Sequence, residues 1–128
     1  MRAILDTNCF LWGITDSEKL SSAARSFMAD LDNSLCLSAA SLWEIAVKVS
    51  IGKLELLRPF DQLIPEQLAV NAIDLLPIEP PHLSRLITLP FHHRDPFDRL
   101  IIAQAQTEDI ALVSSDAVFQ KYDVKLIW

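Results

Sequence analysis

Short apolar runs alternate along the chain with longer segments in which apolar residues recur every three or four positions. The runs end at polar or turn residues and have no polar face, as is typical of strands buried on both sides of a sheet. We predict five such strands: RAIL (2–5), SLCLS (34–38), IDLLPI (73–78), IALVSS (110–115) and VKLIW (124–128). The helical spacing predicts helices at 9–14, 16–31, about 41–51, 59–72 with a break at Pro65, 80–90, about 96–108 and 116–122.

Strands that are separated by helices predict an α/β fold, a three-layer sandwich with a mostly parallel central sheet flanked by helices. The chain has 128 residues, of which 51% are hydrophobic, enough for one core but not for two independent domains. We therefore expect residues 1–128 to form a single domain. In sheets of this kind ligands bind beyond the carboxyl ends of the strands, so the residues that follow the strands are the first functional candidates.

The charge and the apolar runs limit the possible partners. With 17 acidic and 11 basic side chains, the formal net charge is −6 at pH 7, and such a protein has no overall attraction for a polyanion unless bound divalent cations reverse the local charge. No apolar run is long enough to span a membrane, and Met1 and Arg2 lead straight into AIL rather than into a secretory signal, so we expect a cytoplasmic protein without membrane contact. Cys9 and Cys36 lie in apolar segments without the paired spacing of a zinc site, which predicts buried free thiols.

Two aspartates directly follow predicted strands. Asp6 comes after RAIL, and Asp116 comes after IALVSS. Each has two interpretations, a helix N-cap or a functional carboxylate, and the sequence favours neither. Thr7 and Asn8 could cap the first helix equally well, and Ser114 could cap the last, which weakens the need for either aspartate as a cap.

A third acidic residue, Glu44, lies within a predicted helix. On a helical projection the core stripe consists of Leu42, Ile45, Ala46 and Val49. Glu44 lies opposite this stripe, next to Trp43 and Ile51 as well as Lys48. An ion pair with Lys48, four positions later in the same helix, would account for Glu44 through helix stability alone. A carboxylate flanked by tryptophan and isoleucine instead suggests the wall of a cleft, and both interpretations remain open.

The stretch HRDPFDRLIIAQAQ (93–106) places a dense group of charges at the start of a predicted helix. Asp95 followed by Pro96 matches an N-cap and the first helical position, so capping fully explains Asp95. Asp98 then falls at the third helical position, where it either supports the helix N-terminus or is available for chemistry. Arg99 either pairs with Asp95 at i and i+4 or faces a phosphate. The histidines just before Asp95 are expected to lie in a loop.

The four carboxylates Asp6, Glu44, Asp98 and Asp116 are predicted to meet at one end of the sheet. Packed carboxylates repel one another and raise one another's pKa values, so such a cluster is stable at neutral pH mainly when it holds a cation. A set of oxygen ligands suits Mg²⁺ or Mn²⁺, and such an ion can orient a water for attack on a phosphodiester. The residues therefore predict metal-dependent phosphoryl-transfer chemistry, most simply that of a nuclease.

The sequence resembles the PIN-domain ribonucleases of the VapC type, the toxin components of type II toxin-antitoxin pairs. The similarity spans nearly the whole chain and rests on ILDTNCFLW, SAASLWEIAVKVSIGKLEL, HHRDPFDRLIIAQAQ and LVSSDAVFQKYDVKLIW, in that order. It implies a PIN-like fold and an Mg²⁺- or Mn²⁺-dependent endoribonuclease whose catalytic and metal-binding acids are Asp6, Glu44, Asp98 and Asp116. Ser114 keeps the hydroxyl where the family often has threonine, two residues before the last acid. The supporting residues of the candidate site are Asp95, Thr7, Asn8, Ser114 and Arg99.

The resemblance also implies partners. It implies RNA as the substrate, a homodimer, and a cognate antitoxin that inserts a helix into an apolar groove and blocks the active site. Trp12, Trp43 and Ile51 are candidates for such a surface, although core packing explains them equally well.

Two other functions remain open on the residues alone. One is an aspartyl-phosphate phosphatase or receiver-like domain with Asp6 as its nucleophile, and the presence of Asn8 in place of a second acid argues against it. The other is a non-catalytic module that keeps the fold and only docks RNA or protein. The presence of all four acids argues against the second alternative.

Overall fold

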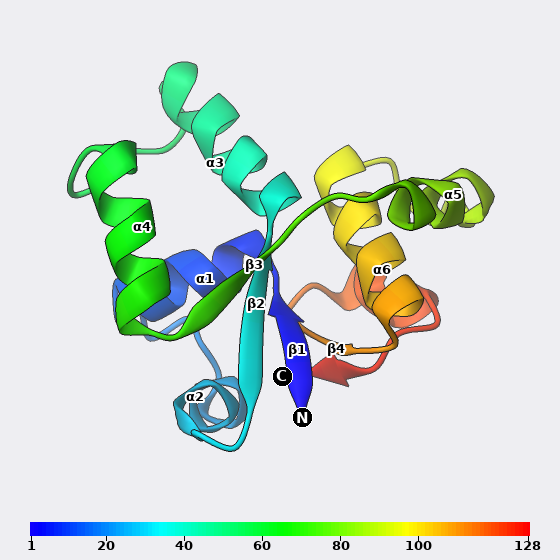
Figure 1. Cartoon of the computed structure of the whole chain (residues 1–128), viewed down its shortest axis with the longest axis horizontal. Coiled ribbons are helices and arrows are strands. Elements are labelled where there is room, and N and C mark those ends of the chain that lie inside the picture. The colour runs from blue at the N-terminus through cyan, green and yellow to red at the C-terminus, as the bar shows by residue number, and fades with distance from the viewer.

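Five parallel strands form the central sheet of the protein, which we describe from a computed structural model of residues 1–128 (Figure 1). The strands are β1 (Arg2–Leu5), β2 (Ser34–Ser38), β3 (Ile73–Leu76), β4 (Ala111–Val113) and β5 (Leu126–Ile127). Their order in the sheet is β3-β2-β1-β4-β5, and every neighbouring pair is parallel. The predicted α/β class is confirmed, and the first strand lies at the centre of the sheet.

Helices cover both faces of this sheet. They are α1 (Thr7–Ile14), α2 (Ser22–Ala29), α3 (Ala39–Ser50), α4 (Phe60–Val70), α5 (Pro80–Thr88) and α6 (Pro96–Glu108), and a short 3₁₀ helix, η1 (Ala117–Lys121), precedes β5. Because successive strand residues point to opposite faces, Ala3 and Leu5 of β1 pack in one core with α1, α2 and α4. Ile4 packs in a second core with α5, α6 and η1. The two cores give the predicted three layers, which Figure 1 shows with α1, α2 and α4 on one side of the strands and α6 on the other.

The helix that carries Glu44, α3, begins at the carboxyl end of β2 and extends beyond the sheet (Figure 1). It starts at Ala39, slightly earlier than predicted, because the Ser38 side chain accepts a hydrogen bond of 3.0 Å from the backbone N–H of Ala40 and caps the helix. It ends before Gly52, whose φ of 75° is in the left-handed region that glycine adopts without strain, as predicted. The predicted burial of Ala46 is wrong, because a helix that projects past the sheet is covered over less of its circumference.

The helix predicted at 16–31 is shorter than expected. Its N-cap is Ser21, whose hydroxyl accepts a hydrogen bond of 3.1 Å from the N–H of Ala24, and the capping start placed at Asp16 is wrong. Asp16 has a φ of 50°, so the chain turns there instead of continuing a helix. Arg25 holds this turn with an ion pair of 2.6 Å to Asp16 and a hydrogen bond to the carbonyl of Ser17.

Smaller differences concern a proline and the thiols. Pro65 lies inside α4 and does not break it, in contrast to the prediction. The helix stays continuous because the two residues before the proline, Leu63 and Ile64, are buried in contact with the rest of the protein and offset the lost backbone hydrogen bond.

Cys9 and Cys36 are free and buried, as predicted. None of the helices combines the length and the apolar character needed to cross a bilayer.

Candidate functional site

The four acidic residues singled out from the sequence line one pocket at the carboxyl edge of the sheet. Asp6 follows β1 and Asp116 follows β4, and these two strands are neighbours, whereas Glu44 comes from α3 and Asp98 from the first turn of α6. The pocket has a volume of about 180 Å³ and no apolar lining residue. Its lining consists of Asp6, Thr7, Asn8, Glu44, Lys48, Asp95, Asp98 and Asp116, which we call the acid pocket.

Asp6 serves as a helix cap and as a wall of the acid pocket. Its Oδ1 accepts a hydrogen bond of 2.7 Å from the backbone N–H of Cys9, which caps α1. Burial raises the pKa of Asp6, hydrogen bonds from Ser114 and Cys9 oppose this effect, and the nearby charge of Asp116 adds to it. The Ser114 hydroxyl also accepts a hydrogen bond of 3.1 Å from the backbone N–H of Asp116. Ser114 is therefore hydrogen-bonded to both aspartates.

Glu44 is buried, with only 6% of its surface exposed, and both of its oxygens have partners. Its Oε1 accepts a hydrogen bond of 2.6 Å from the Thr7 hydroxyl, which also lies 3.0 Å from that of Ser41. Its Oε2 forms an ion pair of 2.7 Å with Lys48. The two interpretations of Glu44 therefore both hold, since it pairs with Lys48 and also lies in the wall of a pocket.

At the start of α6, Asp95 caps the helix and Asp98 lines the acid pocket, the two positions that the sequence indicated. Asp95 is the N-cap and accepts the backbone N–H of Asp98 at 2.9 Å. Asp98 occupies the third helical position, and burial raises its pKa to about 7, helped by the negative charges of Asp95, Glu44, Asp116 and Asp6 in that order. The acidic neighbours that add to this shift are the other four carboxylates of the acid pocket.

An aromatic contact next to these acids fixes the distance between the two helices that supply them. The rings of Trp43 on α3 and Phe97 on α6 meet edge to face, with centroids 5.0 Å apart. Trp43 is followed in the sequence by Glu44, and Phe97 is followed by Asp98, so each aromatic residue is next to an acid of the pocket. Packing between α3 and α6 therefore sets how closely these two carboxylates approach.

The acid pocket suits a hard divalent cation. Every acidic ligand in it is a carboxylate oxygen, the type of donor that Mg²⁺ and Mn²⁺ prefer. Five carboxylates face a single basic side chain, Lys48, and the raised pKa of Asp98 shows that their repulsion is not fully compensated. A dication bound among them would remove this repulsion, so the residues present fit such an ion.

Arg99 lies outside the acid pocket, and neither predicted contact of this residue is formed. The side chain is buried and donates hydrogen bonds to the carbonyl oxygens of Leu89 at 3.1 Å and Pro90 at 2.7 Å. Its guanidinium also lies 3.9 Å from the centre of the Phe91 ring. Arg99 therefore anchors the loop that precedes α6 rather than pairing with Asp95 or facing a phosphate.

His93 lies in the predicted loop before α6, but its contacts with Asp98 and Tyr122 were not predicted from the sequence. His93 approaches Asp98 with its Nε2 and Tyr122 with its Nδ1. No pattern in the sequence connects the loop before α6 with Tyr122, which is 29 positions away from His93.

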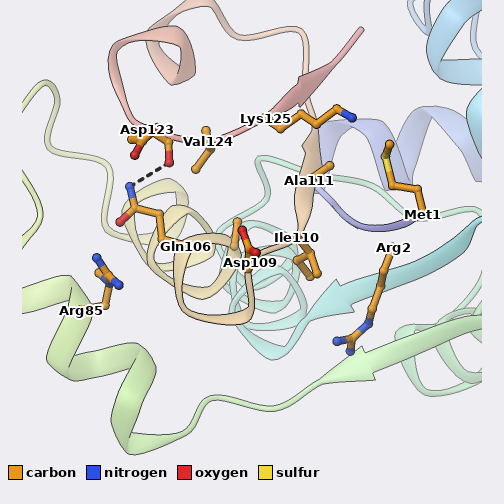
Figure 2. A pocket seen from close by; sticks show the side chains of 11 residues that line it. Met1, Arg2, Arg85, Gln106, Asp109, Ile110, Ala111, Asp123, Val124 and Lys125 are labelled. Atoms are coloured by element: carbon orange, nitrogen blue, oxygen red, sulfur yellow. Dashed lines mark hydrogen bonds between the residues drawn. The ribbon is translucent and has the colours of Figure 1, made fainter.

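The largest cavity of the protein lies at the opposite edge of the sheet. It has a volume of about 650 Å³, and Figure 2 shows Arg2 and Ala111, near the amino ends of β1 and β4, in its wall. Its charges are mixed, with Lys125 and Asp109 among the lining residues. Ligands of parallel sheets bind at the carboxyl edge, so the acid pocket remains the better candidate despite its smaller size.

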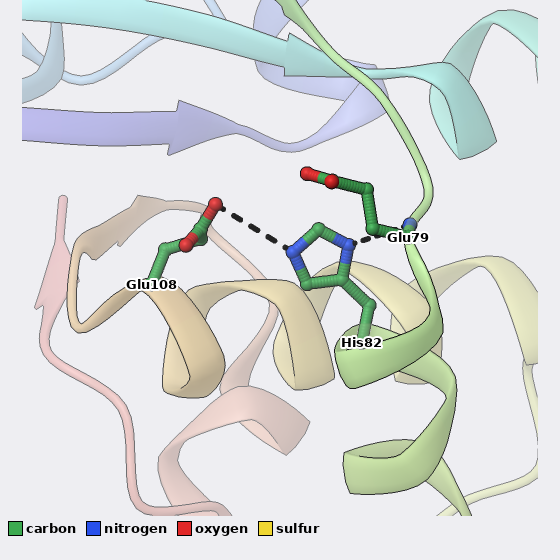
Figure 3. Close-up of side chains that lie close together, drawn as sticks. All are labelled: Glu79, His82 and Glu108. Atoms are coloured by element: carbon green, nitrogen blue, oxygen red, sulfur yellow. Dashed lines mark hydrogen bonds and ion pairs between the residues drawn. The ribbon is translucent and has the colours of Figure 1, made fainter.

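A second group of metal-ligating residue types, Glu79, His82 and Glu108, connects α5 with α6 (Figure 3). The Nδ1 atom of His82 accepts the backbone N–H of Glu79 at 3.0 Å. A neutral imidazole that accepts at Nδ1 carries its proton on Nε2, which points toward Glu108 at 3.6 Å. Neither ring nitrogen then offers a free lone pair, so this group is a packing contact between two helices.

The parallel sheet and the acid pocket at its carboxyl edge define an α/β protein with a candidate divalent-metal site. A family model, the PIN domain, matches residues 3–125, and the chain belongs to the PIN domain family. Comparison with curated protein sequences gives no significant match.

Solved structures with the same fold include three VapBC structures. DNA-bound VapBC from Salmonella typhimurium is 16% identical with a TM-score of 0.70, and the match covers 98% of this chain and 96% of that one. VapBC-1 from nontypeable Haemophilus influenzae is 18% identical with a TM-score of 0.68 and the same coverage of 98% and 96%. VapBC2 from Rickettsia felis, bound to a promoter DNA fragment, is 18% identical with a TM-score of 0.67 and coverage of 98% and 97%. At these identities the likeness shows a common fold.

Proposed function

We propose that the protein is a Mg²⁺- or Mn²⁺-dependent endoribonuclease and the toxin of a VapC-type toxin-antitoxin pair. The observation that carries this proposal is the acid pocket, which is lined by Asp6, Glu44, Asp98 and Asp116 from four separate segments of the chain. Membership of the PIN domain family supports nuclease chemistry, and the fold shared with VapBC structures supports the toxin assignment.

Asp6, Glu44, Asp98 and Asp116 are the residues that would hold the ion. When bound, the ion would supply the positive charge that attracts a phosphodiester and stabilises the developing negative charge on its oxygens. The protein's own part is to orient the ligands. Thr7 directs one oxygen of Glu44, and helix N–H groups hold one oxygen each of Asp6 and Asp116. Asp116 is exposed, so the pocket is open to a polymer such as RNA on that side.

The proposal includes an antitoxin and a second copy of the chain as partners. Two structures of the same fold, one from Klebsiella pneumoniae and VapBC-5 from Mycobacterium tuberculosis, are a toxin-antitoxin complex and a member of the VapBC family of toxin-antitoxin systems by name. An apolar groove of about 290 Å³ beside α1, lined by Leu11, Trp12 and Leu56 among others, is the surface we assign to an antitoxin helix. Trp43 and Ile51 are 60% and 59% exposed, so neither is accounted for by core packing.

Cleavage of a defined RNA by the purified protein tests the proposal. We expect cleavage with Mg²⁺ or Mn²⁺ and none in chelator. Asp6→Asn, Glu44→Gln and Asp116→Asn should each reduce the rate more than about 100-fold, beyond the effect typical of residues that only support a metal ligand. The matched control is Asp32→Asn, which removes the same charge from an exposed loop and should cleave like the wild type. Equal activity of the pocket variants and the control would refute the site.

The two alternative functions predict different results in the same preparation. A phosphatase or receiver-like domain would form an acid-stable acyl-phosphate on Asp6 after incubation with a phosphoryl donor, which a nuclease would not. A non-catalytic docking module would bind RNA without cutting it under any metal condition.

A further inference from the structure

Four side chains form a continuous series of polar contacts that ends on Asp98. The Nη1 atom of Arg99 lies 3.3 Å from the hydroxyl of Tyr122, which lies 2.7 Å from Nδ1 of His93. The Nε2 atom of His93 lies 3.4 Å from Oδ2 of Asp98. The series connects a buried residue of α6 through η1 and the preceding loop to the acid pocket.

The chemistry of arginine sets the direction of this series. A guanidinium only donates hydrogen bonds, so the Tyr122 oxygen accepts from Arg99 and keeps its single proton for another partner. The nearest partner is Nδ1 of His93, and its distance of 2.7 Å is typical of a strong hydrogen bond from a hydroxyl. A neutral imidazole that accepts at Nδ1 has its proton on Nε2. His93 therefore donates toward the carboxylate of Asp98.

Packing holds the donors of this series in place. Arg99 and Tyr122 are 4% and 6% exposed, and the guanidinium is fixed by two carbonyl oxygens in addition to Tyr122. The ring of His93 meets those of Tyr122 and Phe119 edge to face, with centroids 5.5 and 6.3 Å apart. These contacts restrict the orientation of the imidazole.

We propose that His93 is a positioning residue of the acid pocket. Its Nε2–H donates to Oδ2 of Asp98 and leaves Oδ1 available to a cation, and Tyr122 and Arg99 favour the tautomer that makes this possible. The role in cation binding rests on the proposed function, whereas the direction of the hydrogen bonds does not. Hydrogen-bonded partners of this kind typically change metal affinity 10- to 100-fold when they are removed.

Nitrogen NMR of the imidazole rings tests the tautomer without metal or RNA. In chelator at pH 9, where imidazole rings are neutral, we expect the His93 ring of the ¹⁵N-labelled wild type to carry its proton on Nε2 and not on Nδ1. Tyr122→Phe removes the hydroxyl but keeps the ring, and should release His93 from this single tautomer. A wild-type ring protonated at Nδ1 would overturn the proposal.

Titration with Mn²⁺ tests the positioning role without any measurement of cleavage. His93→Ala should weaken binding about 10-fold or more, whereas His93→Gln, which keeps an N–H at a similar reach, should stay within about threefold of the wild type. His92→Ala is the matched control, because His92 contacts the Tyr122 ring edge to face at 4.8 Å and has no contact with Asp98. Tyr122→Phe provides a second variant that leaves the packing intact.

The outcomes separate this inference from the proposed function. A wild type that binds Mn²⁺ with an affinity unchanged in His93→Ala and Tyr122→Phe would overturn the positioning role alone. A wild type that binds no Mn²⁺ would overturn the proposed function, and the NMR result would still decide the direction of the hydrogen bonds.

Discussion

Replacing Asp98 by asparagine should stabilise the protein in the absence of metal. Asp98 is the carboxylate whose pKa is raised to about 7 by burial and by its acidic neighbours. Asparagine has nearly the same shape and keeps an oxygen that can accept from His93, so the substitution mainly removes a charge. The folded chain binds the Asp98 proton more tightly than the unfolded chain does. Stability of the wild type therefore falls as the pH rises from about 4 to about 7, and the full penalty applies above that range.

The size of the effect follows from the pKa. A rise from 3.8 to about 7 corresponds to about 4 kcal/mol for a fully buried group. The Asp98 side chain is 24% exposed, so screening by solvent reduces this to about 2 kcal/mol. For a chain of 128 residues the entropy of unfolding is about 0.27 kcal/mol/K, which converts about 2 kcal/mol into about 7 °C in Tm.

Thermal unfolding followed by circular dichroism in chelator measures this difference. At pH 8 we expect Asp98→Asn to melt about 7 °C above the wild type, and at pH 5 the gap should be smaller, because folded Asp98 is then more fully protonated. Asp32→Asn, an exposed site with the same change of charge, should show no comparable gap. A variant that melts no higher than the wild type at pH 8, or a gap that is equal at both pH values, would refute the electrostatic reasoning.

Three further substitutions test other contacts of the pocket and its supports. Thr7→Val removes the hydroxyl that donates to Glu44 at 2.6 Å and should cost about 1–3 kcal/mol, measured by urea unfolding; a loss under about 0.5 kcal/mol would contradict this. Lys48→Met removes the only basic group of the acid pocket and should tighten Mn²⁺ binding in a calorimetric titration, whereas weaker binding would mean that Lys48 helps to form the site. Ser38→Ala leaves the buried Gln104 side chain without its hydroxyl partner and should lower the free energy of unfolding by about 1–3 kcal/mol; an unchanged urea midpoint would exclude such a role.

The three central strands, β1, β2 and β4, could be predicted from the sequence because they are buried on both faces and therefore apolar on both. The edge strand β3 departs from that pattern, since Asp74 and Leu75 are exposed. The helix starts were less predictable. Ser21 and Asp16 both have side chains that can cap, and only the left-handed backbone of Asp16 excludes it. The burial of Ala46 depended on how far α3 projects past the sheet, which is a property of the whole fold.

The acids of the candidate site could be predicted because of where they fall in the chain. Asp6 and Asp116 follow neighbouring parallel strands, and such strands have their carboxyl ends at the same edge. The supporting contacts were not predictable in the same way. Arg99 turned away from both expected partners because the loop before α6 offered it two carbonyl oxygens, and His93 meets Tyr122 only through the tertiary fold.

Capping and metal binding were alternatives in the sequence, but in the structure they support each other. A helix N-terminus presents free N–H groups and a positive dipole end, so it holds a carboxylate and lowers the cost of its charge. Asp6, Asp95 and Asp116 each accept a hydrogen bond from a backbone N–H through Oδ1. Glu44 and Asp98 are held by side chains instead. Caps at the carboxyl edge of a parallel sheet can thus gather acids that would otherwise repel one another.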